Sequence, residues 1–507
     1  MRRQPNIILI TTDQQRTDSL QCYGSSFTCT PAANRLADEG VLLERAYCAD
    51  PVCTPARVSL LSGLQVSRHG AWNVGVKTNP SLSLLSHRLK SAGFATHYIG
   101  KMHLQPFGAE RSLEATKHWE QRFPHFTGPY YGFDSVELAL GHARTGITGH
   151  YGAWVRSQVS PTEFAQLSKP GRRLAQHPFG GAGIDWDMPV ALHNSVWTAD
   201  RTISWLTQHQ AYHPTTPFFL GIGFQDPHHP HMVPVDYPHR VSPDAVPLPD
   251  FVPGELADKP PHFQSAHQGK LEESTVRGQY RVAGQGVGAD YAGVPHHEAR
   301  LGRAYYYTMC QLIDQQLTRI LDCLDQLRLT ENTFVIFTTD HGELLGDHGL
   351  WLKGPFHYEQ LIKVPLIMRW PAGLPRGRRI SGLFSHVDIA PTILAALDLS
   401  WQTNEFDGVN ALPLLQGETE RIRDDVLVEC VDDPLKLRLK TLVTEERKLT
   451  WYAGSSLGEL YDLHADPHER VNQWHNQKYA HDKAHLLSRL LHYMESLERR
   501  DMRESYA

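Results

Sequence analysis

The sequence has few cysteines, no long apolar run and no block of like charge. Seven cysteines in 507 residues are an odd number, and no two of them have C-x-x-C spacing, which argues against a disulfide framework. No stretch approaches the roughly 20 apolar residues that cross a bilayer. The net charge of −6 and the absence of a Lys/Arg run argue against nucleic acid as a partner.

The N-terminus resembles a signal peptide only superficially. Two arginines precede a short apolar run, but the run reaches Asp13 where a small-residue cleavage site would stand. A first β-strand explains it better. With 41% hydrophobic and 21% charged residues, the chain has the composition of a globular enzyme with a large core. We therefore expect a soluble, cytoplasmic protein that has no membrane partner.

Short apolar runs recur along the first 370 residues, with helical segments between them. Runs that are apolar throughout are typical of strands covered on both faces, and hence of a mostly parallel sheet flanked by helices in an α/β fold. The clearest helix covers 309–324, where apolar residues fall at helical spacing. The expected strands lie at 6–12, 94–100, 218–224, 333–339 and 365–370.

Two long stretches and the C-terminal segment differ from this pattern. Residues 104–190 are rich in aromatic residues, His and Gly, and residues 227–300 in Pro, Gly and His, so both are expected to form the walls of a pocket. Short strands and a helix over 485–500 are typical of a smaller α+β domain. We expect a main domain over 1–420, with the two stretches as insertions, and a C-terminal domain over 421–507.

Polar residues follow three of the expected strands. Asp13 and Gln14 follow the first strand, the histidines that begin at His228 follow the third, and Asp340 and His341 follow the fourth. Ligands in open α/β sheets gather at the carboxyl ends of the strands, so these groups are candidates for one shared site. The alternative is that each Asp caps the next helix, which is the commoner role of that residue type.

The chemistry of these groups favours a hard cation. Asp13, Gln14, Asp340 and His341 offer mainly oxygen ligands and one imidazole, a set that suits Ca²⁺ or Mg²⁺ better than a metal bound by thiolates. Cys53, in "VCTPARVSLLSG", does not fit that set as a thiol. A cysteine nucleophile would need a histidine partner or a phosphate-binding loop rather than a hard metal.

The stretch that begins at Cys53 resembles a known signature. "CTPARVSLLSG" matches the C-x-P-x-R-x-x-x-L-x-G pattern of the type I sulfatases, which belong to the alkaline-phosphatase-like superfamily. Six segments in the order of that family cover nearly the whole chain, which makes the resemblance specific. The other five are "PNIILITTDQQR", "GKMHL", "FQDPHHP", "TTDHGELLGDHGLWLKGPFHYE" and "ELYDLHADPHERVN".

The resemblance implies an alkaline-phosphatase-like fold, with 1–420 as the catalytic domain, and hydrolysis of a sulfate monoester. In this family the cysteine is converted after translation to formylglycine, whose hydrated aldehyde supplies the nucleophilic oxygen. That oxygen attacks sulfur while the alcohol leaves, and the second hydroxyl of the hydrate is then deprotonated and expels sulfate, which restores the aldehyde. On this interpretation Cys53 is a precursor, and a formylglycine-generating enzyme is a partner.

The resemblance also implies roles for individual residues. One divalent cation, Ca²⁺ first with Mg²⁺ or Mn²⁺ as alternatives, would be held by Asp13, Asp340, His341 and the residue derived from Cys53. Gln14 stands where many members have a second Asp, and its amide oxygen can still coordinate. The other implied positions are Arg57, Lys101 and His103 around the hydrate and sulfate, His228 and Lys353 on the leaving-group side, and Asn73 as a substrate contact.

Two other functions are compatible with these motifs. Relatives with the same formylglycine motif hydrolyse phosphonate monoesters or phosphodiesters, but Lys101 and His103 form the Lys-x-His pair that sulfatases carry. A non-catalytic binding protein of the same fold would require an unmodified Cys53. The sequence identifies neither the oligomeric state nor the alcohol of the ester, since the insertions suit a sugar and an aryl group equally. The substrate is thus a small-molecule or saccharide sulfate ester.

Overall fold

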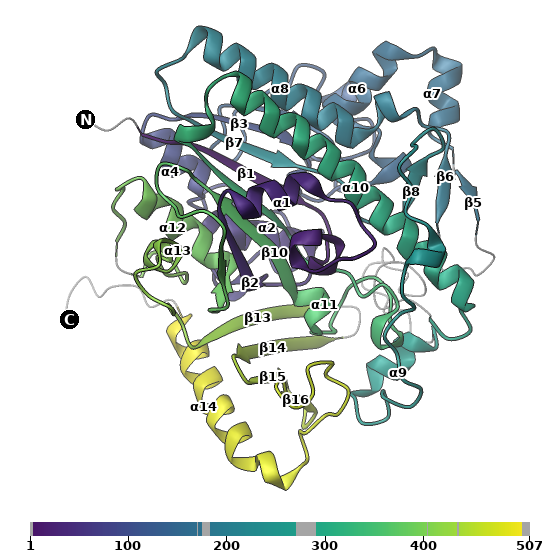
Figure 1. The fold of residues 1–507 in the computed structure, drawn as a ribbon, viewed down its shortest axis with the longest axis vertical. Coiled ribbons are helices and arrows are strands. Elements are labelled where there is room, and N and C mark those ends of the chain that lie inside the picture. Colours follow the sequence, from purple (N-terminus) through teal and green to yellow (C-terminus); the bar gives the residue numbers. More distant parts are fainter. Residues whose placement is uncertain are drawn as a thin grey trace.

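A nine-stranded sheet forms the centre of the protein (Figure 1). The computed structural model describes residues 4–169, 171–174, 183–269, 291–402, 404–432 and 436–498. The strands of the sheet are β1 (Asn6–Thr12), β2 (Val41–Tyr47), β3 (Ala95–Gly100), β4 (Ser135–Leu138), β7 (Phe218–Gly223), β9 (Thr333–Thr339), β10 (Lys363–Arg369), β11 (Arg378–Ile380) and β12 (Phe384–Ser385). Their order is β11-β2-β10-β9-β1-β7-β3-β4, and β12 also pairs with β2.

The pairings confirm the predicted mostly parallel sheet. Strand β10 runs antiparallel to both of its neighbours, and the other pairings of the sheet are parallel. The expected strands at 6–12 and 333–339 coincide with β1 and β9, and the other three match β3, β7 and β10 to within two residues. Strands β2 and β4 were not predicted, because Glu44, Arg45 and Glu137 interrupt their apolar pattern.

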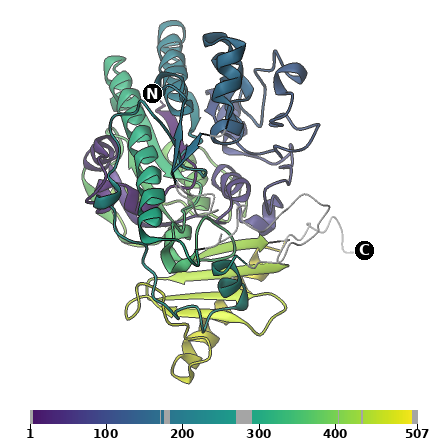
Figure 2. The same ribbon diagram turned by 90° about the vertical axis from the view of Figure 1, so that its right-hand side faces the viewer.

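Helices cover both faces of this sheet, as the alternation of side chains along a strand requires (Figures 1 and 2). Ile7 and Leu9 of β1 belong to one buried apolar cluster, whereas Ile8 and Ile10 belong to another. The first cluster includes side chains of α2, α4 and α12, and the second includes side chains of α1, α8 and α10. These helices are α1 (Pro31–Asp38), α2 (Cys53–Ser62), α4 (Leu85–Ser91), α8 (Asn194–Tyr212), α10 (His296–Gln326), which contains the predicted helix 309–324, and α12 (Ile389–Ala396).

A second sheet packs beside the first and is drawn in yellow-green in Figures 1 and 2. Its antiparallel strands are β13 (Asp425–Asp432), β14 (Leu437–Thr444), β15 (Arg447–Tyr452) and β16 (Gly458–Asp462), and α14 (Ala480–Ser496) covers it. One face buries Leu427 and Leu442 against Leu486 and Leu490 of α14. The other face contributes to the main core through Val428. The boundary at 420 for an independent domain stays a prediction.

The two stretches predicted to be insertions carry short elements. A three-stranded sheet joins them, because β6 pairs with both β5 and β8. The elements include α5 (Trp119–Arg122), α6 (Gly149–Gln158), α7 (Pro161–Leu167), β5 (Arg172–Arg173), β6 (Ile184–Trp186), β8 (Met232–Pro234) and α9 (Pro261–His267). Positions 170, 175–182 and 270–290 of these stretches lie outside the described residues.

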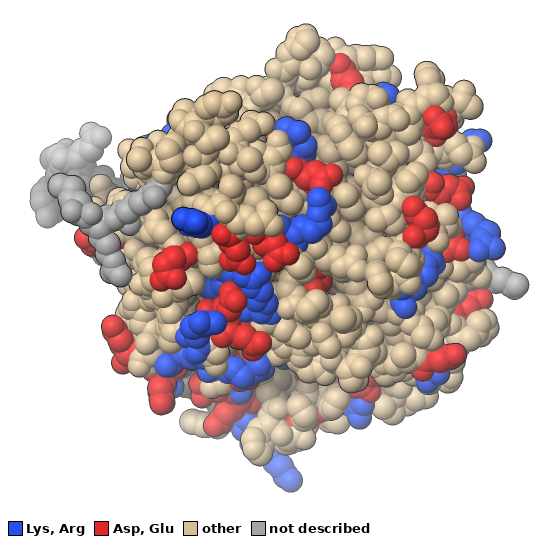
Figure 3. Space-filling model, turned by 45° about the horizontal axis from the view of Figure 1, so that its top comes forward, with Lys and Arg blue, Asp and Glu red and all other residues tan. Residues whose placement is uncertain are grey.

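The surface face drawn in Figure 3 mixes charges of both signs. Basic and acidic side chains lie beside one another in small groups, and large parts of the face carry neither. This face therefore offers no extended surface of one sign. In the part of the chain that the structure describes, no helix has the length and apolar character to cross a membrane.

Helix α2 is buried over its whole length, so the backbone groups at its two ends need partners and space within the protein. The Asp50 carboxylate accepts a hydrogen bond from the Val52 amide at 2.8 Å before the first turn. The helix ends at Gly63, whose φ of 69° lies in the left-handed region. A Cβ added at Gly63 would lie 2.6 Å from Cδ1 of Phe406. Gly63 is therefore required by both the backbone conformation and the packing.

Replacing Gly63 by Ala should lower the melting temperature more than the same change at Gly70. Gly70 ends the short helix α3 (Val66–His69) with a φ of 73°, but no atom lies within 4 Å of a Cβ added there. Gly70→Ala should cost only the left-handed conformation, about 1 kcal/mol. Gly63→Ala adds the clash with Phe406. Equal decreases for the two variants in scanning calorimetry would contradict a steric role for Gly63.

Candidate active site

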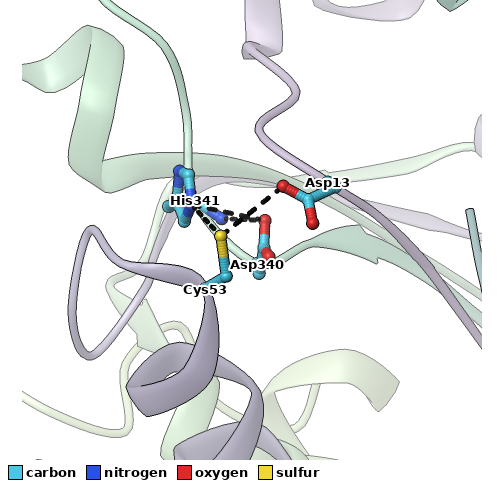
Figure 4. Close-up of side chains that lie close together, drawn as sticks. All are labelled: Asp13, Cys53, Asp340 and His341. Carbon is cyan, nitrogen blue, oxygen red and sulfur yellow. Dashed lines mark hydrogen bonds and ion pairs between the residues drawn. The ribbon is translucent and has the colours of Figure 1, made fainter. Parts of the chain in front are cut away.

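The ends of β1 and β9 and the start of α2 meet at one buried point (Figure 4). Asp13 and Asp340 directly follow β1 and β9, and Cys53 is the first residue of α2. The two strands are parallel neighbours whose last residues pair in register, so the carboxylates that follow them lie together. One ligand atom from each of Asp13, Cys53, Asp340 and His341 lies within 4.8 Å of the others. All four side chains are buried.

Cationic side chains keep both carboxylates ionised inside the protein. Arg57 donates to Asp340 Oδ2 at 2.8 Å and to Asp13 Oδ2 at 3.2 Å, and Lys101 forms an ion pair with Asp13. Burial by itself raises the pKa of Asp13, but Lys101 and Arg57 outweigh burial and hold this pKa well below its usual value. Burial and the neighbouring Asp13 raise the pKa of Asp340, but the cationic Arg57 and Lys101 help to hold this pKa below its usual value.

The Cys53 thiol lies inside this cluster and is a poor nucleophile. Its Sγ is 2.8 Å from Lys353 Nζ, 3.3 Å from His341 Nε2 and 3.7 Å from Asp13 Oδ1. Burial and the negative charge of Asp13 raise the pKa of Cys53 to about 11. Because the thiolate is the reactive form of cysteine, the thiol is inert at neutral pH. The surroundings therefore do not activate an unmodified cysteine.

His341 and Gln14, which adjoin Asp340 and Asp13 in the chain, each carry an unprotonated acceptor atom. Nδ1 of His341 lies 2.8 Å from Gly342 O and donates to it, so Nε2 is the unprotonated nitrogen of the ring. Burial lowers the pKa of His341 to about 4, so the ring is neutral. Gln14 uses Nε2 to contact Glu343 and His229, and its buried Oε1 has no hydrogen-bond partner among the described residues. Carboxylate, amide and imidazole acceptors together suit a hard divalent cation.

A second group of side chains lies next to Cys53 and His341. Nε2 of His228 is 3.1 Å from Lys353 Nζ, and its Nδ1 is 2.5 Å from His229 O. Burial lowers the pKa of His228 well below its usual value, with a further contribution from His142. Since Nδ1–H of this neutral ring donates to the carbonyl, Nε2 is the atom that accepts from Lys353. The structure thus places the predicted pair His228 and Lys353 in direct contact.

The loop after β3 brings Lys101 and His103 to the site. The buried Glu114 carboxylate accepts from the His103 amide at 2.7 Å and also from the next two backbone amides, which holds the loop. His103 stacks on Phe107, with ring centroids 4.0 Å apart, and its buried Nδ1 has no partner among the described residues. Lys101 Nζ lies 3.2 Å from His142 Nε2. This loop therefore adds a cation and an unpaired imidazole nitrogen to the cluster.

Asn73 is engaged elsewhere. Its Nδ2 donates to Val431 O at 3.0 Å on β13, and its Oδ1 accepts from the Val74 amide at 2.7 Å. These contacts link the loop after α3 to the C-terminal sheet. The role of Asn73 as a substrate contact stays a prediction.

His142 lies at the site but was not among the predicted site residues. His142 stacks on His228 with ring centroids 3.5 Å apart and an interplanar angle of 8°. It follows β4 at the same edge of the sheet as Asp13 and Asp340. The rule that sites form at the carboxyl ends of strands would have indicated it, but β4 had not been recognised as a strand.

Comparison with known proteins agrees with this arrangement. The family profile described as Sulfatase matches residues 5–399, and the profile described as N-sulphoglucosamine sulphohydrolase, C-terminal, matches residues 346–496. The uncharacterized sulfatase YidJ of Escherichia coli (strain K12) is 28% identical over 506 residues, which are 99% of this chain and 89% of the relative. An arylsulfatase of Clostridium perfringens is 27% identical over 503 residues, covering 97% of this chain and 95% of the relative.

Among solved structures, the phosphonate monoester hydrolase of Agrobacterium radiobacter superimposes with a TM-score of 0.79 at 25% identity, over 98% of this chain and 96% of that one. The fold is therefore shared between enzymes that act on sulfur and on phosphorus. The Sulfatase profile spans most of the chain, and the residues of its signature converge on the buried cluster around Cys53. This chain accordingly belongs to the sulfatase family of hydrolases, within the alkaline-phosphatase-like superfamily.

Proposed function

We propose that this protein hydrolyses a sulfate monoester and releases inorganic sulfate, using formylglycine formed from Cys53 and one divalent cation, Ca²⁺ or Mg²⁺. The observation that carries this proposal is the position of Cys53 Sγ, 3.3 Å from His341 Nε2 inside the cluster of candidate metal ligands. A thiol with a raised pKa has no evident use there. An aldehyde hydrate at the same position would present oxygen to a hard cation.

Formylglycine would supply the nucleophile, and the cation would supply the Lewis acid. Formylglycine would provide a geminal diol, and the cation, held by Asp13, Gln14, Asp340 and His341, would increase its acidity and offset charge on the sulfate. Arg57 keeps the two carboxylates in place through ion pairs at 2.8 and 3.2 Å. These residues prepare the site before substrate binds.

The other cationic residues suit the binding of a sulfate and the departure of an alcohol. Lys101 and His103 come from the loop after β3 and are the proposed contacts for sulfate oxygens. Lys353 lies between Cys53 Sγ and His228 Nε2. Burial lowers the pKa of Lys353, but its neighbours Cys53, Asp13 and Asp340 raise it above its usual value. The two carboxylates remain when position 53 carries formylglycine, and they favour the protonated amine. It can stabilise the departing alkoxide, and His228 is placed to exchange a proton with it.

The alcohol of the ester is proposed to be an aryl group or a sugar. Phe107 is half-buried beside His103, with its ring 6.0 Å from the Lys101 Nζ. A flat apolar ring next to cationic groups suits the face of an aromatic or a sugar ring. The similarity to an arylsulfatase over 97% of this chain supports the same class.

Hydrolysis of phosphonate monoesters is the second candidate. It is favoured by the superposition with a phosphonate monoester hydrolase at a TM-score of 0.79. A phosphonate monoester carries one negative charge, as a sulfate monoester does, so the two reactions differ in the charge that develops on the transferred group, which the cationic residues must match. Lys101 and His103 are the residues that we expect to favour hydrolysis of a sulfate ester over that of a phosphonate ester.

The tryptic peptide Ala46 to Arg57 should contain an aldehyde at position 53 and a free thiol at Cys48. Protein for this measurement should come from a host that matures sulfatases. Cys48 is an internal control, since it is buried outside the cluster and should take one alkylating group. Mass spectrometry of fully active protein that shows two alkylated cysteines would refute the formylglycine mechanism.

Replacing Asp13 or Asp340 by Asn should abolish metal binding and activity, because each change removes a charged oxygen ligand while keeping the side-chain shape. Elemental analysis of the unchanged protein should find about one Ca²⁺ or Mg²⁺ per chain. Asp407→Asn is the matched control: this largely buried carboxylate pairs with Arg68 outside the cluster. If both cluster variants still bind one metal ion per chain, the two carboxylates serve only as helix caps.

Lys101→Ala should reduce kcat/KM for 4-nitrophenyl sulfate by at least about tenfold, equivalent to about 1.4 kcal/mol of transition-state stabilisation. The unchanged enzyme should prefer this sulfate to the corresponding phosphonate and phosphodiester. Lys90→Ala removes an exposed lysine that pairs with Asp134 and should leave kcat/KM unchanged. A phosphonate that proves the better substrate, with a sulfate rate insensitive to Lys101→Ala, would establish the second candidate instead.

A further inference from the structure

Glu343 is a buried carboxylate that the proposed reaction does not use. It follows the candidate ligands Asp340 and His341 by two or three residues and is 0% exposed. Its Oε1 accepts hydrogen bonds from the Leu345 amide at 3.0 Å and from the Leu352 amide at 2.5 Å. Two backbone donors on one oxygen hold the carboxylate plane in place, so Glu343 has a fixed orientation.

The other oxygen of Glu343 receives the side chain of Gln14. Nε2 of Gln14 donates to Glu343 Oε2 and lies 3.2 Å from His229 Nδ1. A carboxylate can only accept, so the contact with Glu343 determines which end of the Gln14 amide is the nitrogen. The amide oxygen must then face the opposite way.

The backbone of Gln14 is also held in place. Its amide donates to Asp340 Oδ1 at 2.9 Å, its carbonyl accepts from the Tyr306 hydroxyl at 2.8 Å, and its φ of 68° is left-handed. The fixed backbone and the fixed nitrogen leave Oε1 buried without a hydrogen-bond partner among the described residues. Burial of an unsatisfied oxygen is unfavourable, and a bound cation would offset this cost.

We propose that Glu343 is a positioning residue that fixes the Gln14 amide so that its oxygen, rather than its nitrogen, faces the cation. This inference rests on the proposed cation site. A carboxylate at position 14 would present an oxygen in either orientation, whereas the Gln14 amide needs a neighbour that holds its NH₂ group away from the cation. A side-chain amide can present either its oxygen or its NH₂ group to the cation, and only the oxygen attracts the cation. A neighbouring acceptor that binds the NH₂ group, here Glu343, therefore selects the orientation in which the oxygen faces the cation.

Titration calorimetry with Ca²⁺ on the metal-stripped, full-length protein tests this role. In Glu343→Gln, the new amide must use its oxygen to accept from Leu345 and Leu352, so its NH₂ group faces Gln14. The Gln14 amide then turns over and presents its own NH₂ group to the cation. We expect Ca²⁺ affinity to fall at least tenfold, with an unchanged circular dichroism spectrum.

The reciprocal variant Gln14→Glu/Glu343→Gln should restore the affinity to the wild-type value or above it. Here the amide at 343 donates to the carboxylate at 14, whose second oxygen faces the cation. A merely structural role of Glu343 would not be rescued by this exchange. Glu459→Gln is the matched control, because Glu459 is also buried but lies on β16, where it accepts from the hydroxyls of Tyr452 and Tyr461; its Ca²⁺ affinity should stay within twofold.

The outcomes separate this inference from the proposed function. Absence of Ca²⁺ binding by the unchanged protein would refute the cation site itself. Equal affinities for the unchanged protein and Glu343→Gln would refute the role of Glu343 alone, as would a loss that the double variant does not reverse. If Glu343→Gln does not fold, the double variant decides: Ca²⁺ affinity tenfold below that of the unchanged protein would overturn the inference.

Discussion

The ion pairs of Arg57 with Asp13 and Asp340 are the interaction on which the rest of the site depends. Two carboxylates that follow neighbouring strands are brought together without access to water, and each raises the pKa of a buried neighbour. Removing one partner of a buried ion pair typically costs about 3–5 kcal/mol, because the other charge is left uncompensated. The same guanidinium donates to the backbone carbonyls of Thr12 and Lys101, so it also ties β1 and the loop after β3 to helix α2.

The remainder of the fold holds these charges in a rigid frame. Helix α2 has no exposed residue, so its position is set by packing on all sides. The segment before it is joined to the C-terminal sheet, where the Glu429 amide donates to Ala49 O at 2.8 Å. Through this hydrogen bond the C-terminal sheet supports the segment that leads into α2 and the site. Lys353 also lies in the region that both family profiles match.

The imidazoles around the cluster differ from the carboxylates in their charge. Burial lowers the pKa values of His103, His142 and His228 well below the usual range, and Lys101 adds to the effect in each case. Three neutral rings therefore stand beside Lys101 and Lys353, which carry the positive charge. Neutral rings can donate and accept hydrogen bonds without adding to the charge of the cationic side chains.

The sequence by itself determined the type of fold and the residues of the cluster. Continuous apolar runs at 6–12 and 333–339 are possible only where both faces of a strand are covered, and the polar residues that follow them mark the edge at which ligands gather. The signature at Cys53 identified the family. These features could be predicted from the sequence because each strand, the polar residues that follow it and the signature consist of residues adjacent in the chain.

Only the tertiary structure decided how distant segments meet. His142 became part of the site because β4, whose pattern Glu137 interrupts, lies at the same edge of the sheet. Asn73 donates to the C-terminal sheet rather than to an atom of the cluster. The contact of Glu343 with Gln14 joins residues 329 positions apart and determines the orientation of an amide. Hydrogen bonds of this kind depend on distances and angles between loops, which no local pattern of residues encodes.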